Sequence, residues 1–255
     1  MSVYSAIRNA IDASVPVAVV TVVSGEGAGN KLVVLPDSRV GSLGSDALDE
    51  LAVPEAERLL GEQRSRTLPF PTESGEIELF FEVFPAPPTL LIFGAVHVGQ
   101  ALATIGKLLD FRVIVTDARA KLLSEDRFPM ADQLILGWPQ DAIAQVDIDQ
   151  NTYVAILTHD PKFDEPALLG TLATEARYIG AVGSRKTSAE RLVRLGKAGV
   201  PEEQLARIRG PIGLNIGATT PEEMAISIFA EIIAVKHGRD AQPLVTAKGN
   251  VRDRD

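Results

Sequence analysis

Cysteine is absent from the 255 residues of this chain, which excludes disulfide bonds, thiolate metal sites and cysteine nucleophiles. Aromatic side chains make up only 5% of the residues, and histidine occurs three times. The 25 basic side chains are outnumbered by 34 acidic ones, giving a formal net charge of −9. Because this charge repels phosphodiester backbones and anionic lipids, we expect neither nucleic acid nor a membrane as a partner.

Long hydrophobic runs are also missing, since no apolar run approaches the roughly 20 residues that a membrane-spanning helix needs. The stretch from Val15 to Val23 could imitate a secretion signal, but only Arg8 provides a positive charge ahead of it, Asp12 lies between them, and the stretch is mostly valine. We interpret this valine-rich stretch as a buried strand and expect a cytoplasmic protein.

Three prolines within Phe84 to Pro88 predict a linker, because proline removes backbone donors and favours an extended path. We therefore place an N-terminal domain at residues 1–84, a linker at 85–88, a second domain at 89–240 and a tail at 241–255.

The N-terminal domain is predicted to be a small α/β domain. The β-branched runs 17–23 and 31–35, separated by a glycine-rich segment, predict a hairpin. Residues 45–60 show a helical pattern and residues 77–83 alternate like a strand.

After the linker, apolar runs alternate with helical patterns, which predicts a Rossmann-like, doubly wound parallel sheet. The predicted strands are 90–93, 112–116, 133–136, 153–157 and 178–182. Two helical stripes are predicted to pack on this sheet, formed by Val98, Leu102, Ile105 and Leu109 and by Met224, Ile228, Ile232 and Val235. Thr220, Pro221 and Glu223 predict a capping box for the last helix, and Gly238 suits its end.

Ligands of open parallel sheets bind beyond the carboxyl ends of the strands, and four such places carry candidate residues. The first is a glycine loop that is similar to the dinucleotide pattern G-x-G-x-x-G, except that Val96 replaces the middle glycine. A β-branched residue there obstructs the pyrophosphate and penalises a positive φ. A tight turn without a nucleotide is therefore the alternative. The candidate cofactor-binding residues of this loop are Gly94, Ala95, Val96, His97, Val98 and Gly99.

The second place is Asp117, 18 residues after Gly99, where an acidic side chain can accept hydrogen bonds from a ribose diol. An ordinary turn aspartate is the alternative. Arg119 is a further candidate, and Arg119 and Arg127 could neutralise a phosphate or one another.

The third place follows a strand at Thr158, where His159 is a candidate ligand contact and Asp160 a candidate N-cap. The fourth runs from a strand into a helix with two cations, which suits an anion but equally suits a solvated basic first turn. Its candidate residues are Gly183, Ser184, Arg185 and Lys186. The apolar, glycine-punctuated segment 211–218 is expected to pack near the pocket. No acid–base or nucleophile pair is visible, so we predict no catalytic residue. His159 with Asp164 and Glu165 could suggest a metal, but histidine with carboxylates is common in loops, and we predict no metal site.

Together these segments resemble the XdhC/CoxI family, whose members are accessory factors of molybdenum hydroxylases such as xanthine and carbon monoxide dehydrogenases. The resemblance rests on 93–100, 117–119, 127–129, 158–160, 178–186 and 211–218, and more weakly on 40–44. It implies a maturation factor that binds the molybdenum cofactor, as molybdopterin or its dinucleotide form, shields it, helps its sulfuration and passes it to the apoenzyme. The implied partners are a molybdenum hydroxylase apoenzyme and a cofactor sulfurase, and a homodimer is left open.

Two departures from the family pattern keep alternatives in view. Val96 stands where the family usually has glycine, and Ser45 and Asp46 follow Gly44 where the family usually has a cysteine nearby. An NAD-dependent oxidoreductase, favoured by Asp117 but weakened by Val96, is the first alternative. A degenerate assembly partner without bound cofactor is the second.

Overall fold

The computed structural model describes residues 2–72 and 75–246. The chain divides into two compact units, the first ending at Pro87 and the second beginning at Pro88. Of the predicted tail 241–255, residues 247–255 lie outside the described residues. None of the described helices has the length and apolar character needed to cross a membrane.

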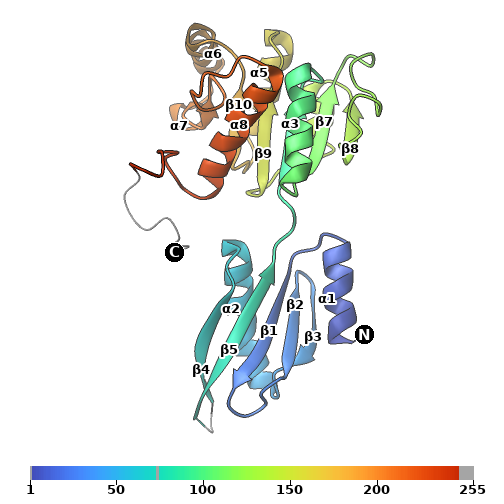
Figure 1. Cartoon of the computed structure of the whole chain (residues 1–255), viewed down its shortest axis with the longest axis vertical. Helices are drawn as coiled ribbons and strands as arrows, with labels where there is room; N and C mark the ends of the chain where they lie inside the picture. The colour runs from blue at the N-terminus through green and yellow to red at the C-terminus, as the bar shows by residue number, and fades with distance from the viewer. Residues whose placement is uncertain (1, 73–74, 247–255) are drawn as a thin grey trace. The chain divides into compact units, whose positions relative to one another are not determined.

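The first unit is a five-stranded antiparallel sheet in the order β3-β2-β1-β5-β4, with one helix against each face (Figure 1). Its elements are α1 (Val3–Asp12), β1 (Val17–Ser24), β2 (Lys31–Leu35), β3 (Ser38–Ser42), α2 (Asp46–Glu62), β4 (Arg66–Thr72) and β5 (Gly75–Phe84). The predicted hairpin is confirmed, because β1 and β2 pair antiparallel with Ala18 opposite Val34. The unit is therefore the small α/β domain that the sequence predicts.

Strand β4 was not predicted, because it contains Pro69 and Pro71. Proline cannot donate to a ladder hydrogen bond and is confined to edge strands. β4 is such an edge strand, since it pairs with β5 alone. Helix α1 and the short edge strand β3 were also missed.

The second unit is a six-stranded parallel sheet in the order β11-β10-β9-β6-β7-β8. Its elements are β6 (Thr89–Phe93), α3 (His97–Leu108), β7 (Arg112–Asp117), β8 (Gln133–Leu136), α4 (Pro139–Ile143), β9 (Thr152–Ile156), α5 (Pro161–Leu172), β10 (Tyr178–Ala181), α6 (Arg185–Lys197), α7 (Glu202–Leu205), β11 (Ile208–Arg209) and α8 (Pro221–Lys236). This is the Rossmann strand order, which confirms the predicted parallel, doubly wound fold.

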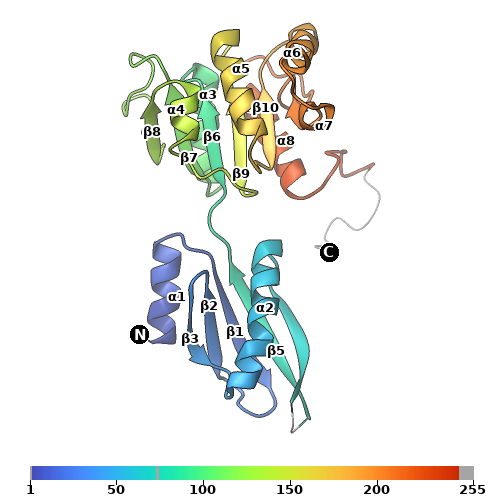
Figure 2. The same cartoon turned by 180° about the vertical axis from the view of Figure 1, so that it is seen from behind.

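Helices cover both faces of this sheet because alternate residues of its central strand point to opposite sides. Leu90 and Ile92 belong to a core cluster with residues of α3 and α8, while Leu91 and Phe93 belong to a second cluster with residues of α4, α5 and α6. Figure 1 shows α3 and α8 side by side on one face, and Figure 2 shows α4 and α5 on the other.

The predicted helical stripes are mostly correct. Leu102 is fully buried in α3, but Leu109 follows the helix as its C-cap and is half-exposed, so its assignment to the buried stripe was wrong. In α8 the predicted capping box of Thr220 and Glu223 is confirmed. The helix ends at Lys236, shortly before Gly238 adopts a positive φ.

Candidate functional site

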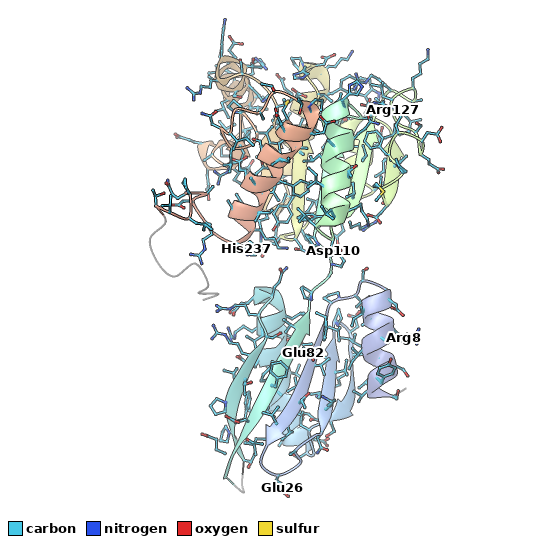
Figure 3. All side chains as sticks on the ribbon, in the orientation of Figure 1. Arg8, Glu26, Glu82, Asp110, Arg127 and His237 are labelled. Atoms are coloured by element: carbon cyan, nitrogen blue, oxygen red, sulfur yellow. The ribbon has the colours of Figure 1, made fainter. Side chains whose placement is uncertain are left out.

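The predicted binding residues follow β6, β7, β9 and β10, so they share the carboxyl edge of the parallel sheet. The strand order reverses at β6, because β7 and β8 continue to one side and β9 to β11 to the other. Such a reversal is the switch point where open α/β sheets bind ligands. In Figure 3, Arg127 marks this carboxyl edge, and Asp110, just after α3, marks the opposite edge.

In the glycine loop between β6 and α3, two glycines lie so close to neighbouring atoms that a side chain would not fit. Gly94 has a φ of +116°, and a Cβ there would lie 3.0 Å from Cγ2 and 3.2 Å from the backbone nitrogen of Thr158. A Cβ at Gly99 would lie 2.7 Å from the carbonyl oxygen of Gly94. Both positions therefore require glycine, so that α3 can approach the loop and the loop can approach the turn after β9.

Val96 adopts an extended conformation with a φ of −91° and is the N-cap residue of α3. The expected positive-φ penalty at Val96 was therefore wrong, because the positive φ of this loop is at Gly94. The Val96 side chain is partly buried against the hydrophobic core, and it gives no side-chain cap to the helix. Among the residues that the structure describes, no side chain caps the first N–H groups of α3, and these groups have no intrahelical acceptor, which leaves a helix N-terminus that can receive an anion. His97 is exposed in this first turn.

Asp117 fixes the glycine loop from inside the fold. Its Oδ2 atom accepts from the Ala95 N–H at 2.8 Å and from Arg119 Nη2 at 2.7 Å, and its Oδ1 atom accepts from the Arg119 N–H at 2.9 Å and from Nε at 2.8 Å. Burial raises the pKa of the Asp117 carboxyl, but these hydrogen bonds and the Arg119 charge outweigh burial and hold the pKa below its usual value. A carboxylate has about four acceptor positions. Four donors already occupy Asp117, which disfavours its predicted role toward a ribose.

Arg127 also holds the glycine loop by hydrogen bonds. Its Nη1 atom donates to the carbonyl oxygens of Ala95 at 3.1 Å and Leu122 at 2.7 Å, and its Nη2 atom donates to Gln100 Oε1 at 3.1 Å. The suggestion that Arg119 and Arg127 neutralise one another was wrong, because Arg119 pairs with Asp117 and Arg127 donates to loop carbonyls.

A buried ion pair connects the turn after β9 with the turn after β10. The Thr158 hydroxyl donates to Asp164 Oδ1, and Arg191 Nη2 donates to Asp164 Oδ2 at 3.0 Å and to the Val182 carbonyl at 2.9 Å. The side chains of Asp164 and Arg191 are 4% and 3% exposed. Because Gly94 also contacts Thr158, this pair links the glycine loop to the loop that starts α6.

The third and fourth predicted places lie at helix starts. Asp160 is confirmed as the N-cap of α5, where it accepts from the Lys162 N–H at 3.1 Å, and His159 is exposed beside it. Gly183 precedes the N-cap Ser184 of α6. Exposed Arg185 and Lys186 occupy the first turn of α6, so cations and helix N–H groups occur together there.

Two buried polar atoms belong to side chains in the first two turns of α6. Within the described part of the chain, neither Ser188 Oγ nor Arg191 Nη1 has a hydrogen-bond partner. Ser188 lies close to the loops after β10 and β11, since its Oγ atom would be 3.7 Å from a Cβ at Gly183 and 3.2 Å from one at Gly210. Sequence reasoning named neither Ser188 nor Arg191, because nothing in the local pattern distinguishes them from the solvated face of a basic helix.

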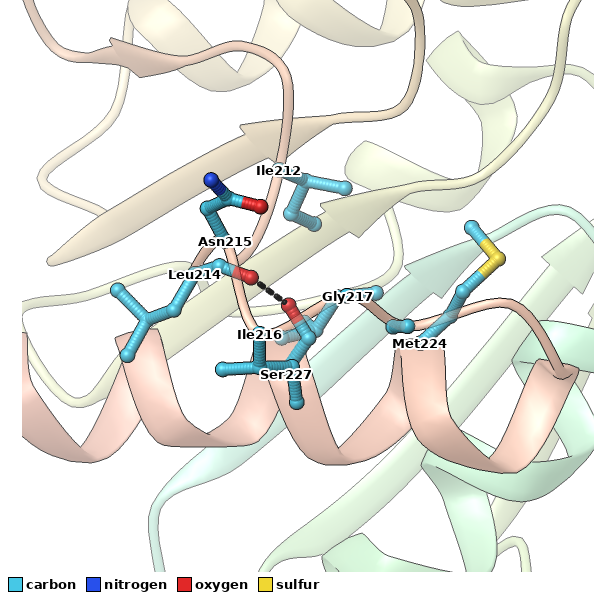
Figure 4. A pocket seen from close by; sticks show the side chains of 9 residues that line it. Ile212, Leu214, Asn215, Ile216, Gly217, Met224 and Ser227 are labelled. Atoms are coloured by element: carbon cyan, nitrogen blue, oxygen red, sulfur yellow. Dashed lines mark hydrogen bonds between the residues drawn. The ribbon is translucent and has the colours of Figure 1, made fainter.

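The segment 211–218, which is expected from the sequence to pack near the pocket, packs against α8. Ser227 Oγ donates to the Leu214 carbonyl at 2.6 Å (Figure 4). The Gly213 N–H donates to Glu231 Oε2 at 2.8 Å. The same Glu231 oxygen accepts from the Tyr178 hydroxyl at 2.6 Å, and burial together with the Glu231 charge raises the pKa of Tyr178.

A small cavity of about 200 Å³ lies between this segment and α8. Its lining is mostly apolar and comprises Ile212, Leu214, Asn215, Ile216, Gly217, Ala218, Met224, Ser227 and Ile228. None of the predicted binding residues lines it. Because ligand pockets usually exceed about 300 Å³, the cavity can hold part of a cofactor at most.

Among the described residues, no group of three or more histidine and carboxylate side chains is placed to hold a metal ion. The arrangement offers mainly donors: the N–H groups of two helix starts and the guanidinium and ammonium groups of Arg119, Arg185 and Lys186. Its chemistry is therefore suited to hold an anion.

Comparisons with known proteins match both units. The model of the XdhC Rossmann domain matches residues 90–232, and the model of the XdhC and CoxI family matches residues 10–71. A probable xanthine dehydrogenase subunit of Bacillus subtilis is 32% identical over 170 residues, which cover 67% of this chain and 49% of that protein. The molybdenum cofactor insertion chaperone PaoD of Escherichia coli is 34% identical over 99 residues, covering 39% of this chain and 30% of PaoD.

The matches thus span half or less of the length of these two curated relatives. A crystal structure from Bacillus halodurans, described as a xanthine dehydrogenase, is similar to this chain with a TM-score of 0.57. The likeness covers 97% of this chain and 98% of that one at 22% sequence identity, and therefore concerns the fold.

Proposed function

Because the chain belongs to the XdhC and CoxI family, we propose that it binds the molybdenum cofactor and delivers it, after sulfuration, to a molybdenum hydroxylase of the xanthine dehydrogenase type. The relative PaoD, a molybdenum cofactor insertion chaperone, supports this proposal. The absence of a visible acid–base pair supports a binding role over turnover.

The uncapped start of α3 at the switch point is the observation on which the proposal depends. The cofactor is a pterin that carries a phosphate and brings its own sulfur ligands to molybdenum, so a protein that holds it needs an anion cradle more than metal ligands. The glycine loop supplies this cradle, since Asp117 and Arg127 hold it in place before any ligand binds. Arg185 and Lys186 at the start of α6 provide the positive charge for a second contact.

The chain's departure from the family pattern near Gly44 is compatible with this mode of binding. Ser45, which stands in the region of the expected cysteine, is the N-cap of α2 and accepts from the Leu48 N–H at 3.3 Å. Its side chain thus has a structural role that an oxygen performs well. In this chain the cofactor is held through its phosphate and ring, and no cysteine thiolate takes part.

Two features make NAD the weaker candidate. The acceptor positions of Asp117 are filled within the protein, and the Val96 side chain stands where backbone usually approaches a pyrophosphate. A pterin monophosphate, which has no ribose diol at this position, avoids the first conflict.

The test is purification of the full-length chain from a host that makes the molybdenum cofactor, followed by measurement of bound pterin and molybdenum. We expect Arg185→Glu combined with Lys186→Glu to lower cofactor affinity by about 10- to 150-fold for each contact that is lost, because one charge-assisted contact contributes about 1.5 to 3 kcal/mol. The expected consequence is a hydroxylase client that folds but contains less molybdenum and pterin.

Lys197→Glu is the matched control, because Lys197 lies in the last turn of α6, away from the carboxyl edge. This variant should keep its cofactor. Full loading of the client in a strain without this protein would contradict the maturation role, and equal loss in the control would contradict the phosphate contact.

A further inference from the structure

Two buried donors of α6 have no acceptor among the residues that the structure describes. Ser188 is 4% exposed and Arg191 is 2% exposed, yet neither Ser188 Oγ nor Arg191 Nη1 has a hydrogen-bond partner there. Burying a polar group without a hydrogen bond costs free energy, so buried donors in native proteins nearly always have an acceptor. The two residues are three positions apart in one helix and therefore lie on the same face. One acceptor on this face can satisfy both.

Both donors lie beside the loop that starts α6. Helical side chains tilt toward the N-terminus of their helix, and Ser188 Oγ would lie 3.7 Å from a Cβ at Gly183, the residue before the N-cap. The guanidinium of Arg191 is held at the same loop, because its Nη2 atom donates to the Val182 carbonyl at 2.9 Å. Ser188 thus points from inside the fold toward the helix start, and Arg191 accompanies it.

Glycines face the Ser188 hydroxyl from two loops. A Cβ at Gly210, in the loop after β11, would lie 3.2 Å from Ser188 Oγ, closer than one at Gly183. Gly183 has a φ of +153°, which itself favours glycine, but Gly210 does not adopt a positive φ. Its backbone conformation therefore does not require glycine, and what the missing side chain provides is space next to Ser188 Oγ.

The first turn of α6 adds donors from the solvent side. Ser184 Oγ caps the Thr187 N–H at 3.0 Å, which leaves the N–H groups of Arg185 and Lys186 without an intrahelical acceptor. Both side chains are exposed, and Lys186 Nζ lies 3.9 Å from Glu190 in a pair that is open to solvent. The helix start therefore offers donors on its outer side as well as on its inner side.

A phosphate monoester matches donors on two sides better than other phosphates. It carries three terminal oxygens, so that one can face the buried donors while the others face the first turn of α6. A phosphodiester, or the pyrophosphate link of a dinucleotide, offers only two such oxygens on each phosphorus. Asp164 already neutralises Arg191, so the positive potential for a dianion comes from Arg185, Lys186 and the helix dipole.

We propose that Ser188 and Arg191 form the inner half of a phosphate-monoester site at the start of α6, in which one phosphate oxygen accepts from Ser188 Oγ and Arg191 Nη1. The proposal rests on the proposed function for the rest of the ligand, and adds an inner contact to the one assigned there to Arg185 and Lys186. Free inorganic phosphate has the same chemistry, and the experiment separates the two sources.

Calorimetry on the full-length protein measures the binding of inorganic phosphate, methyl phosphate and dimethyl phosphate at equal ionic strength. We expect saturable binding of the first two and no binding of the diester. Ser188→Ala should weaken phosphate and methyl phosphate by about 10- to 150-fold, because a hydrogen bond to a charged group is lost. Without phosphate, the urea midpoint of Ser188→Ala should not fall, because Ser188 Oγ has no partner among the described residues to lose.

Thr171→Val is the matched control, because it removes a buried hydroxyl that donates to the Ala167 carbonyl at 2.7 Å in the last turn of α5. This variant should bind phosphate as the natural protein does. Arg191→Lys keeps a cation beside Asp164 but removes the Nη1 donor, and should weaken phosphate as Ser188→Ala does. If Arg191→Lys does not fold, Ser188→Ala alone decides.

Three outcomes would overturn the site. The first is equal phosphate affinity of Ser188→Ala and the natural protein, and the second is an equal loss of affinity in Thr171→Val. The third is binding of dimethyl phosphate as tight as that of methyl phosphate, or no saturable binding of any of the three probes. In the last case the two donors serve only a buried water molecule.

The proposed function is tested separately, by the pterin that copurifies with the protein. If pterin copurifies equally with Ser188→Ala and with the natural protein, and phosphate affinity is also unchanged, the inner site is wrong while the proposed function stands. If phosphate and methyl phosphate bind through Ser188 but no pterin copurifies with the natural protein, the site stands and the proposed function is wrong.

Discussion

Removing the carboxylate of Asp164 should destabilise the Rossmann unit far more than removing its sequence neighbour, Glu165. Both carboxylates join α5 to α6: Asp164 pairs with Arg191 at 3.0 Å, and Glu165 pairs with Arg194 at 2.6 Å. The two pairs differ in exposure, because the side chains of Asp164 and Arg191 are 4% and 3% exposed while those of Glu165 and Arg194 are 30% and 42% exposed.

The expected magnitudes follow from this difference. Burial raises the pKa of Asp164 even though the Thr158 hydrogen bond and the Arg191 charge act to lower it, so the pair is strongly desolvated. Asp164→Ala leaves Arg191 buried without its counter-ion, which costs about 3 to 5 kcal/mol. Glu165→Ala breaks a surface pair and should cost about 0 to 1 kcal/mol. Adding Arg191→Met to Asp164→Ala removes the unpaired charge, so the double variant should recover part of the stability.

Urea unfolding of the full-length protein, followed by tryptophan fluorescence, measures these effects because Trp138 reports on the Rossmann unit. With a slope of about 2 kcal/mol per molar urea, Asp164→Ala should lower the midpoint by about 1.5 to 2.5 M. A midpoint indistinguishable from that of Glu165→Ala would refute the argument. A double variant less stable than Asp164→Ala would show that the buried charge of Arg191 is satisfied in another way.

Two further predictions concern the glycine loop. The pKa of the Asp117 carboxyl is lowered in the folded state, so its ionised form stabilises the fold above the unfolded pKa. This stabilisation is lost as the pH falls from about 5 to below about 4. Over this range, the urea midpoint of Asp117→Asn should therefore fall less than that of the natural protein. Calorimetry should find NAD(H) binding that is absent or much weaker than micromolar, and Val96→Gly should strengthen it. A low-micromolar Kd for the natural protein, about −8 kcal/mol, would favour the oxidoreductase alternative.

Local patterns predicted the parts of the fold that depend on neighbouring residues in the sequence. The strand before Gly94 and the capping box at Thr220 could be identified because burial and capping act over a few positions. Strand β4 could not, because Pro69 and Pro71 are acceptable there only at a sheet edge, and edge position is a property of the whole sheet.

In the candidate site, too, features within one short segment could be predicted, whereas contacts between distant segments could not. The glycine loop and the cations at Arg185 and Lys186 were visible in the sequence because each lies within one short segment. Asp164 and Arg191 are 27 positions apart in the sequence, and their buried ion pair depends on how α5 and α6 pack.

The position of Asp117 argues for a ligand rich in acceptors. The pattern of a glycine loop followed by an acidic residue predicts an acceptor for a ribose, but here the carboxylate uses its acceptor positions on Ala95 and Arg119. Toward solvent at this part of the edge lie the exposed guanidinium of Arg119 and the uncapped N–H groups of α3, which are donors, together with the carboxylate of Asp160. In a chain with a net charge of −9, such donors gathered at the switch point favour an anion over a neutral diol. The residue that most resembles a dehydrogenase feature in the sequence thus holds, in the folded protein, the loop that we propose as a phosphate cradle.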